Sequence, residues 1–353
     1  MTLFFIFNRF QLILAAEAKE KFGIKDEDSI LLIRTSHPER WKKALDDDKS
    51  HWNKIEIVTP PSKGKVFSVN QAAKKYHAAV DKYSKKYFLN NIILGNYGNP
   101  MMRSIGNKYA SQGSNIIFLD EGIGTLHLYE SRRNHTTGTL KRDFFSKKKV
   151  ALRYFLSKWF LGADFYDVKQ TITFFTQYDL QSNDNTIIVK NDFKRFKREI
   201  IDWEVRSAVY FLGSYVMVER GYISKEVYFN AIGEIARYYS GRFIYYIPHP
   251  LDPISISTEL KDLYSFELLR PDVPFEAFVI QEEFVPGIVA GLLTTAILSC
   301  FEFFWKSCEF NVFSFPLEVV QKNQDIVRRI YDQFDFVMKG GSYKRISLFD
   351  DCK

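Results

Sequence analysis

Short runs of apolar residues recur through the first half of the chain, and segments with apolar residues at helical spacing separate them. Runs this short and this apolar are typical of parallel strands that are buried on both faces of a sheet. They predict strands over residues 3–7, 30–34, 55–58, 92–95, 116–119, 172–175 and 186–189. The helical spacing predicts helices over residues 10–22, 69–88 and 101–111. This alternation of strands and helices predicts a parallel, doubly wound α/β domain.

The same alternation resumes after residues 197–206, which join the two halves of the chain. It predicts strands over residues 208–212 and 242–247, helices over 224–239 and 274–280, and an apolar run at 288–293. The chain has 353 residues, whereas one ordinary domain has ~100–200, so we expect two domains. The first spans residues 1–205, and the second spans residues 206–353 and ends in a C-terminal helix.

Composition narrows the classes of partner. The net charge of +7 is compatible with nucleic acid, anionic lipid or a negatively charged small substrate. The sequence has no long arm of lysine and arginine, which argues against nucleic acid. The three cysteines form no CxxC pair, which suits a reducing cytoplasm and disfavours a disulfide scaffold or a zinc site.

Two apolar segments raise the question of membrane insertion. The N-terminal run lacks a charged leading region and is interrupted by Asn8 and Arg9, so we expect a buried strand and not a signal peptide. No run of ~18 apolar residues occurs, so we expect no spanning helix. Residues 130–165 are basic and aromatic, and we expect them to form a surface insertion. Such a run is usually a solvated face; the alternative is a patch for anionic lipid headgroups, assisted by Trp159 and Phe160.

The first candidate for chemistry follows the strand at residues 116–119, where Asp120 and Glu121 precede Gly122. Ligands of open α/β sheets bind at the carboxyl ends of the strands. Two carboxylates beside a glycine at such an end suggest a reaction centre. The alternative is a turn whose carboxylates are simply solvated.

A second candidate, His249, follows the strand at residues 242–247 and lies between Pro248 and Pro250. The two prolines fix the backbone φ on either side and so aim the imidazole. His37 also precedes a proline, but it lies in a polar loop and we do not expect it to act.

Hydroxyl and carboxyl groups near the start of two predicted helices are further candidates. Thr294 and Thr295 could bind an anion together with the free backbone N–H groups, or they could simply cap the helix. Glu276 could interact with the dipole of its own helix, or it could accept hydrogen bonds from a ribose diol. The residues alone leave both choices open.

Taken in order, these motifs resemble those of the bacterial sialyltransferases, most closely the lipooligosaccharide sialyltransferase and capsule polysialyltransferase groups. The resemblance covers about residues 3–300. The motifs are Asp120-Glu121-Gly122, His249-Pro250, Pro274-Phe275-Glu276, Thr294-Thr295, the segment Phe211-Leu212-Gly213-Ser214 with residues 219–224, and the loop at residues 95–100.

The resemblance implies two Rossmann-like domains that face each other across a cleft, which is the GT-B-type glycosyltransferase architecture. It implies inverting transfer of sialic acid from CMP-sialic acid to a sugar hydroxyl, with no metal and no cofactor. The first domain would hold the acceptor and the second the CMP-sugar. Asp120 would be the general base, with Glu121 orienting it or substituting for it, and His249 would donate to the leaving phosphate. The residues that would bind substrate are Pro250, Glu276, Thr294, Thr295, Gly213, Ser214, Gly122 and Asn96.

We therefore expect a cytoplasmic glycosyltransferase that acts on a cell-surface glycan precursor, with peripheral contact to the inner face of a bacterial membrane. Two rival predictions are the same fold with another nucleotide sugar donor, and a non-catalytic peripheral membrane or glycan-binding protein. The sequence predicts neither the linkage nor the acceptor sugar, and it leaves open single transfer or polymerisation.

Overall fold

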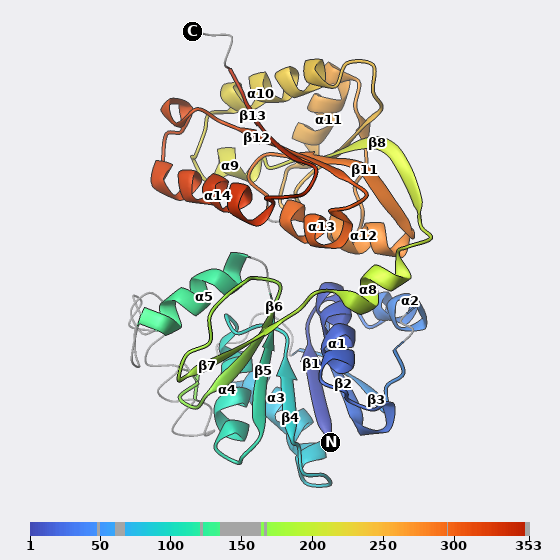
Figure 1. The fold of residues 1–353 in the computed structure, drawn as a ribbon, viewed down its shortest axis with the longest axis vertical. Helices are drawn as coiled ribbons and strands as arrows, with labels where there is room; N and C mark the ends of the chain where they lie inside the picture. The colour runs from blue at the N-terminus through green and yellow to red at the C-terminus, as the bar shows by residue number, and fades with distance from the viewer. Residues whose placement is uncertain are drawn as a thin grey trace. The chain divides into compact units, whose positions relative to one another are not determined.

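The chain divides into two compact units, Met1–Phe196 and Lys197–Lys353 (Figure 1). The computed structural model describes residues 1–47, 50–60, 68–120, 123–134, 164–165, 168–294 and 296–349. Most of the basic, aromatic stretch expected at residues 130–165 lies outside these residues. The chain passes from the first unit to the second between Phe196 and Lys197, whereas we expected the division after residue 205.

Unit 1 contains a seven-stranded sheet in the order β3-β2-β1-β4-β5-β6-β7. All its paired strands are parallel. The strands are β1 (Thr2–Ile6), β2 (Ser29–Arg34), β3 (Lys54–Val58), β4 (Asn91–Leu94), β5 (Asn115–Leu119), β6 (Ile172–Thr176) and β7 (Thr186–Lys190). The chain reverses its direction of travel across the sheet between β1 and β4, as in other doubly wound sheets. This confirms the parallel α/β fold that the apolar runs predict.

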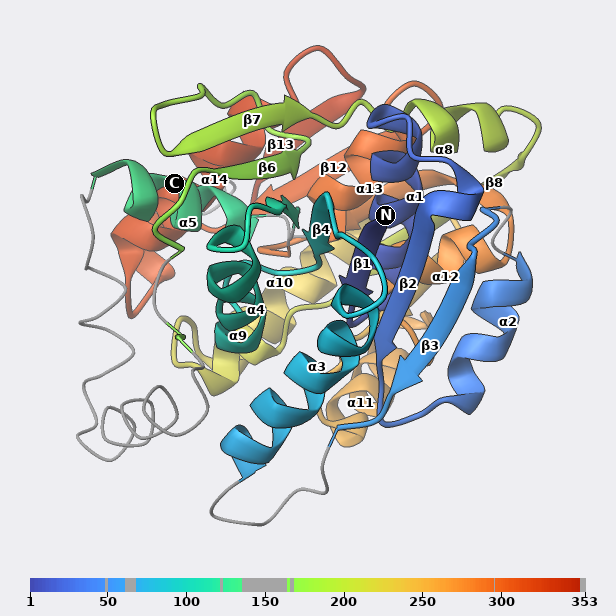
Figure 2. The same cartoon turned by 90° about the horizontal axis from the view of Figure 1, so that it is seen from below.

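Helices connect these strands. They are α1 (Arg9–Lys21), α2 (Glu39–Asp47), α3 (Ser68–Ser84), α4 (Pro100–Ala110) and α5 (Ile123–Asn134). Helix α8 (Lys194–Glu199) follows β7 and leads into unit 2. Figure 2 shows α3 and α4 on one side of the sheet, where apolar residues of both helices share a core with β1, β2, β4 and β5. Asn99 caps α4, and Pro100 occupies its first turn, where a missing N–H costs nothing.

Unit 2 contains a six-stranded parallel sheet in the order β10-β9-β8-β11-β12-β13. The strands are β8 (Glu204–Leu212), β9 (Ile244–Ile247), β10 (Glu267–Leu268), β11 (Phe284–Gly291), β12 (Glu309–Ser314) and β13 (Tyr343–Ser347). The helices are α9 (Val216–Glu219), α10 (Lys225–Tyr238), α11 (Ile254–Tyr264), α12 (Phe275–Gln281), α13 (Ala296–Phe304) and α14 (Gln324–Val337). Here the direction of travel reverses between β8 and β11.

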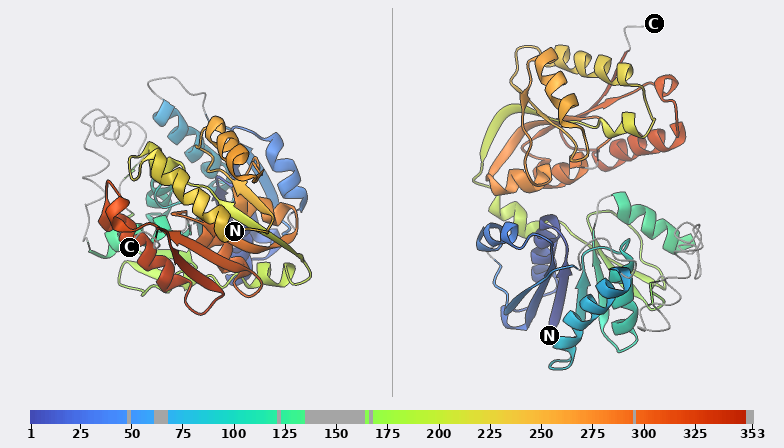
Figure 3. Two further views of the ribbon diagram at one scale, coloured as in Figure 1. Left: turned by 90° about the horizontal axis from the view of Figure 1, so that it is seen from above. Right: turned by 180° about the vertical axis from the view of Figure 1, so that it is seen from behind.

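Several elements of unit 2 were not predicted from the sequence. Helix α11 and strands β10, β12 and β13 are additions, and α14 is followed by a strand, so the C-terminal helix alone was an incomplete prediction. Figure 3 shows α10 and α11, which pack against each other. Among the helices in the described ranges, none combines the length and apolarity needed to span a membrane.

Candidate functional site

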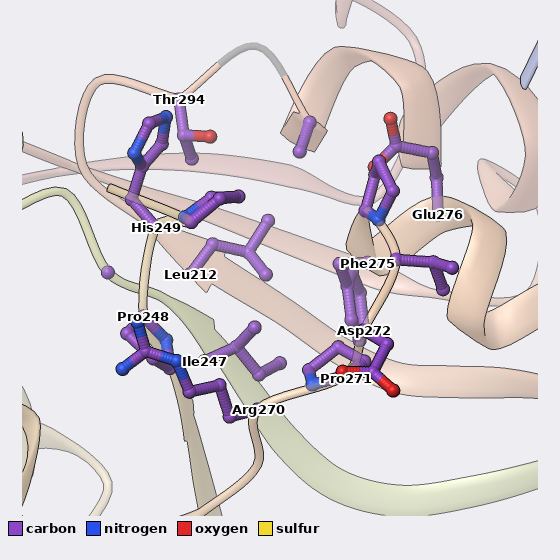
Figure 4. Close-up of a pocket in the computed structure, with 15 residues that line it drawn as sticks. Leu212, Ile247, Pro248, His249, Arg270, Pro271, Asp272, Phe275, Glu276 and Thr294 are labelled. Carbon is purple, nitrogen blue, oxygen red and sulfur yellow. The ribbon is translucent and has the colours of Figure 1, made fainter. Parts of the chain in front are cut away.

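A pocket of about 550 Å³ lies in unit 2 at the carboxyl ends of its central strands (Figure 4). Its walls come from the loops that follow β8, β9, β10 and β11 and from the starts of α12 and α13. Strands β8 and β11 are neighbours in the sheet, and the chain leaves their carboxyl ends in opposite directions across the sheet. The loops after these two strands therefore diverge and leave a crevice between them. This is the place where doubly wound sheets bind their ligands.

Gly213 forms the part of the wall that follows β8, and a side chain at this position has no room. A Cβ atom built on Gly213 would lie 2.5 Å from the hydroxyl oxygen of Tyr246. That hydroxyl is buried and lies 3.0 Å from the hydroxyl of Tyr228. The backbone of the β8 loop therefore packs directly against Tyr246, whose hydroxyl contacts that of Tyr228. This buried pair supports the β8 side of the pocket wall.

His249 forms the wall after β9, and its ring orientation is set by its own loop. The backbone N–H of Leu251 donates to His249 Nδ1 over 3.2 Å. An imidazole nitrogen that accepts a hydrogen bond carries no proton, so the neutral ring has its proton on Nε2. His249 therefore presents an N–H donor from the far side of the ring.

Glu276 lies in the first turn of α12, across the pocket from His249 and Thr294 (Figure 4). Its Oε2 atom is buried and has no hydrogen-bond partner among the residues that the structure describes. Burial raises the pKa of this carboxyl group. Buried polar atoms in proteins nearly always have partners, so this oxygen is available to accept hydrogen bonds from a ligand.

Thr294 and Ala296 bring the start of α13 to the pocket. The Thr294 carbonyl accepts the N–H of Ile297 over 3.4 Å, which places Thr294 just before the first helical turn. The first N–H groups of a helix have no partner within it and attract anions. Thr295 lies outside the described residues.

Ser214 is not part of the pocket wall. It is 1% exposed, and its backbone N–H donates to the Tyr228 hydroxyl over 3.0 Å. Its Oγ is buried and has no partner among the described residues. Pro250 does line the pocket. The structure thus brings together Gly213, His249, Pro250, Glu276 and Thr294 and leaves Ser214 behind them.

Arg270 lines the pocket although sequence reasoning did not select it. It follows β10, which has only two residues and is too short to be recognised from an apolar run. Its Nη2 donates to the carbonyl of Asp252 over 3.0 Å. The proline-rich segment from Arg270 to Pro274, just before Glu276, was the signal that could have pointed to it.

In unit 1, Asp120 lies at the carboxyl end of β5 and is 1% exposed. Thr125 Oγ1 donates to its Oδ1 over 2.6 Å, and Thr176 Oγ1 donates to its Oδ2 over 2.6 Å. The backbone N–H of Gln177 also donates to Oδ2, over 3.0 Å. The carboxylate therefore connects β5 to α5 and to the end of β6. Glu121 and Gly122 lie outside the described residues.

Asn96 lies in the loop after β4 and stabilises that loop. Its Oδ1 accepts the N–H of Asn99 over 3.1 Å. The next residue, Tyr97, is buried, with the guanidinium groups of Arg103 and Arg132 at 5.8 and 6.0 Å from its ring centre. Polar contacts thus fix Asp120 and the loop at residues 95–100 at the carboxyl edge of the sheet.

Within the described ranges, no group of three or more His, Cys, Asp or Glu side chains is arranged to hold a metal ion.

A family model described as alpha-2,8-polysialyltransferase (POLYST) matches residues 2–305. A comparison with curated protein sequences gave no match.

Solved structures share the fold at low sequence identity. An alpha/beta-galactoside alpha-2,3-sialyltransferase from Photobacterium phosphoreum is 12% identical, with a TM-score of 0.52, and the match covers 98% of each chain. A UGT transferase from Siraitia grosvenorii in complex with UDP is 12% identical with a TM-score of 0.50, covering 98% of this chain and 86% of that one. A UDP-GlcNAc 2-epimerase from Methanocaldococcus jannaschii is 9% identical with a TM-score of 0.52, covering 98% and 89%. These matches show the GT-B fold alone, since different reactions share it.

Proposed function

Since the chain belongs to the alpha-2,8-polysialyltransferase family, we propose that it transfers sialic acid from CMP-sialic acid to a hydroxyl of a cell-surface glycan, with inversion and without a metal ion. Family membership makes the chain a glycosyltransferase of the sialyltransferase class, with a nucleotide sugar donor and a glycan acceptor. The identity of the donor, the inversion and the metal independence are the proposed part.

The observation that carries the proposal is the unpartnered, buried Oε2 of Glu276 in the same pocket as His249 and the start of α13. A carboxylate suits the two hydroxyls of a ribose, because it accepts hydrogen bonds at both oxygens. The helix start, Thr294 and the Nε2–H of His249 suit a phosphate, because all of them donate. A nucleoside monophosphate carries both groups, and the pocket offers partners for both.

In the proposed reaction the acceptor hydroxyl attacks the anomeric carbon of sialic acid from the face opposite to CMP. The new carbon–oxygen bond forms as the bond to the phosphate oxygen breaks, which inverts the configuration. The electron pair of the broken bond leaves with the phosphate of CMP. His249 Nε2–H stabilises this charge by a hydrogen bond or by giving up its proton, and Thr294 and the α13 N–H groups add further donors.

The proton of the acceptor hydroxyl requires a base, and we propose Glu121 for this role with Asp120 as its positioning neighbour. Thr125, Thr176 and Gln177 donate hydrogen bonds to the two oxygens of Asp120, so both oxygens already act as acceptors within the fold. They also hold the end of β5 in place. The proposal thus exchanges the two roles that the family resemblance implies, in which Asp120 is the base and Glu121 orients it or substitutes for it.

The first test is the release of CMP from CMP-sialic acid, with and without a galactoside acceptor and with EDTA present. We expect release that the acceptor stimulates, that resists EDTA and that His249→Ala abolishes. His37→Ala is the matched control, because it removes the other histidine that precedes a proline, and we expect it to leave the rate unchanged. If the wild type neither releases CMP nor is stabilised by CMP against heat, the proposed donor is wrong.

Contact with an anionic membrane is a separate proposal that rests on the basic, aromatic composition of residues 130–165. Basic side chains bind anionic headgroups in a salt-dependent manner. We expect the protein to sediment with vesicles that contain phosphatidylglycerol at low salt and to be released at high salt. Equal binding to vesicles of phosphatidylcholine alone would contradict an electrostatic contact.

A further inference from the structure

We infer that Asp252 is a positioning residue of the pocket in unit 2, which holds the loops after β8, β9 and β10 in one arrangement. The expected effect on the KM for CMP-sialic acid rests on the proposed function, whereas the positioning of the loops does not. Asp252 was not selected from the sequence, and its side chain is 2% exposed.

The carboxylate of Asp252 holds the loop that follows β8. The N–H of Tyr215 donates to Oδ2 over 3.2 Å, and the N–H of Val216 donates to Oδ1 over 3.0 Å. These two residues follow Gly213 and begin the short helix α9. Asp252 therefore caps a helix that lies 36 residues away along the chain from Val216 to Asp252.

The same carboxylate holds the loop that follows β9. The N–H of His249 donates to Oδ2 over 3.0 Å, and the N–H of Asp252 donates back to the His249 carbonyl over 2.8 Å. The tight turn that results lets Leu251 donate to the imidazole Nδ1. The orientation of the His249 ring, and with it the direction of the Nε2–H group, depends on this turn.

The backbone of Asp252 holds the third loop, because its carbonyl accepts the Nη2–H of Arg270. Asp252 is thus hydrogen-bonded to the three loops that follow β8, β9 and β10 and form walls of the pocket. Asp252 is not an ordinary cap of its own helix, because α11 begins at Ile254 with Pro253 as N-cap. Its carboxylate accepts from Tyr215 and Val216 in the β8 loop and from His249 in its own loop.

Asparagine cannot reproduce this arrangement. It has one acceptor oxygen in place of two, and its NH₂ group would face an N–H donor. Asp252→Asn therefore leaves either the Val216 N–H or the N–H groups of Tyr215 and His249 without an acceptor. We expect the KM for CMP-sialic acid and the Kd for CMP to rise roughly tenfold, which is the effect of about one lost charge-assisted hydrogen bond.

Two control variants separate positioning from mere stability. Asp262→Asn removes the same charge from an exposed position on α11. Asn311→Ala removes a buried side chain of β12 that bonds to the Tyr239 hydroxyl and should lower stability without touching the pocket. A loss of folded enzyme lowers kcat and leaves KM unchanged. Unchanged KM and Kd in Asp252→Asn, as in the controls, would overturn the inference.

Hydrogen–deuterium exchange tests the inference independently of any activity. In the wild type we expect slow exchange at the amides of Tyr215, Val216 and His249, although all three lie in loops or at a helix start. Asp252→Asn should speed the exchange of the Val216 amide, or of the Tyr215 and His249 amides, at least roughly tenfold, and Asn311→Ala should not. Fast exchange of these amides in the wild type refutes the inference even if Asp252→Asn fails to fold. Slow exchange in a wild type that does not bind CMP refutes the proposed donor and leaves the positioning role standing.

Discussion

Asp120 at the end of β5 and Glu276 in the first turn of α12 have opposite hydrogen-bonding environments. Asp120 accepts hydrogen bonds from two hydroxyls and one backbone N–H, whereas Glu276 has a buried oxygen with no partner in the described part of the chain. The first carboxylate stabilises the fold in its ionised form. The second is destabilising in that form until a ligand satisfies it, which is a frequent property of binding sites.

Replacing Glu276 should therefore stabilise the protein and impair binding. The raised pKa means that the folded state binds a proton more tightly than the unfolded state, so stability falls as pH rises above the ordinary carboxyl pKa. We expect Glu276→Gln to raise the unfolding free energy by about 1 kcal/mol at pH 7 and to give no gain at pH 4. Urea unfolding at the two pH values measures this. A variant that is less stable at pH 7 would show that the carboxylate has a partner.

We expect Asp120 to act mainly in stability and Glu121 mainly in catalysis. Asp120→Asn places an NH₂ group against donors and should cost about 2 kcal/mol of stability. Glu121→Gln should leave stability unchanged and lower kcat by ~10²–10⁴-fold. Thermal unfolding and turnover of both variants decide the assignment. Full turnover in Glu121→Gln would return the role of base to Asp120.

At the scale of elements, the sequence predicted the strands that carry a run of apolar residues and missed those that do not. Strand β13 is mostly exposed at the sheet edge, β10 has two residues, and β12 contains the buried Asn311, which interrupts its apolar pattern. Helix α2 contributes mainly Trp41 to the core, so its apolar face is narrow. Apolar runs predict strands and helices, and the local sequence of these elements contains only short or interrupted runs.

The site divides in the same way. Motif residues at strand ends could be predicted, because parallel strands bring their carboxyl ends to one edge. Asp252 could not, because its role comes from hydrogen bonds between loops that are distant in sequence. Arg270 follows a strand of only two residues, and only the proline-rich segment after it could have pointed to the pocket. Ser214 was selected by its place beside Gly213, but successive residues of an extended segment point in opposite directions, and its side chain is buried behind the wall.

A buried histidine between α3 and α4 in unit 1 should make the unfolding free energy decrease at acidic pH. His77 Nε2 lies 2.8 Å from Ser104 Oγ, and burial, aided by Lys108, lowers the pKa of His77 from 6.5 to about 4. Between these values the unfolded state binds the proton more readily, so stability falls as pH decreases through this range. We expect His77→Gln to reduce that loss by about 2 kcal/mol, measured by urea unfolding at pH 4 and pH 7. An unchanged pH dependence would exclude His77 as its source.

At the scale of the whole molecule, each unit has its own sheet, and the proposed donor site belongs to one of them. The pocket residues all lie between Leu212 and Ala296, within unit 2. We expect CMP to slow hydrogen exchange in the loops after β8, β9, β10 and β11 and in the first turn of α13. Exchange in β1 to β7 is the internal control and should stay unchanged. Protection of unit 1 in place of unit 2 would contradict the assignment of the pocket.

The two sheets are also strictly successive in the chain: every strand of unit 1 ends by Lys190, and every strand of unit 2 begins after it. During translation the ribosome therefore delivers all strands of the first sheet before any strand of the second. The first sheet can close while its apolar strands are the only ones available for pairing, which limits mispairing between two similar parallel sheets. Inserting the second unit between strands of the first would remove this temporal separation and should favour aggregation of the nascent chain.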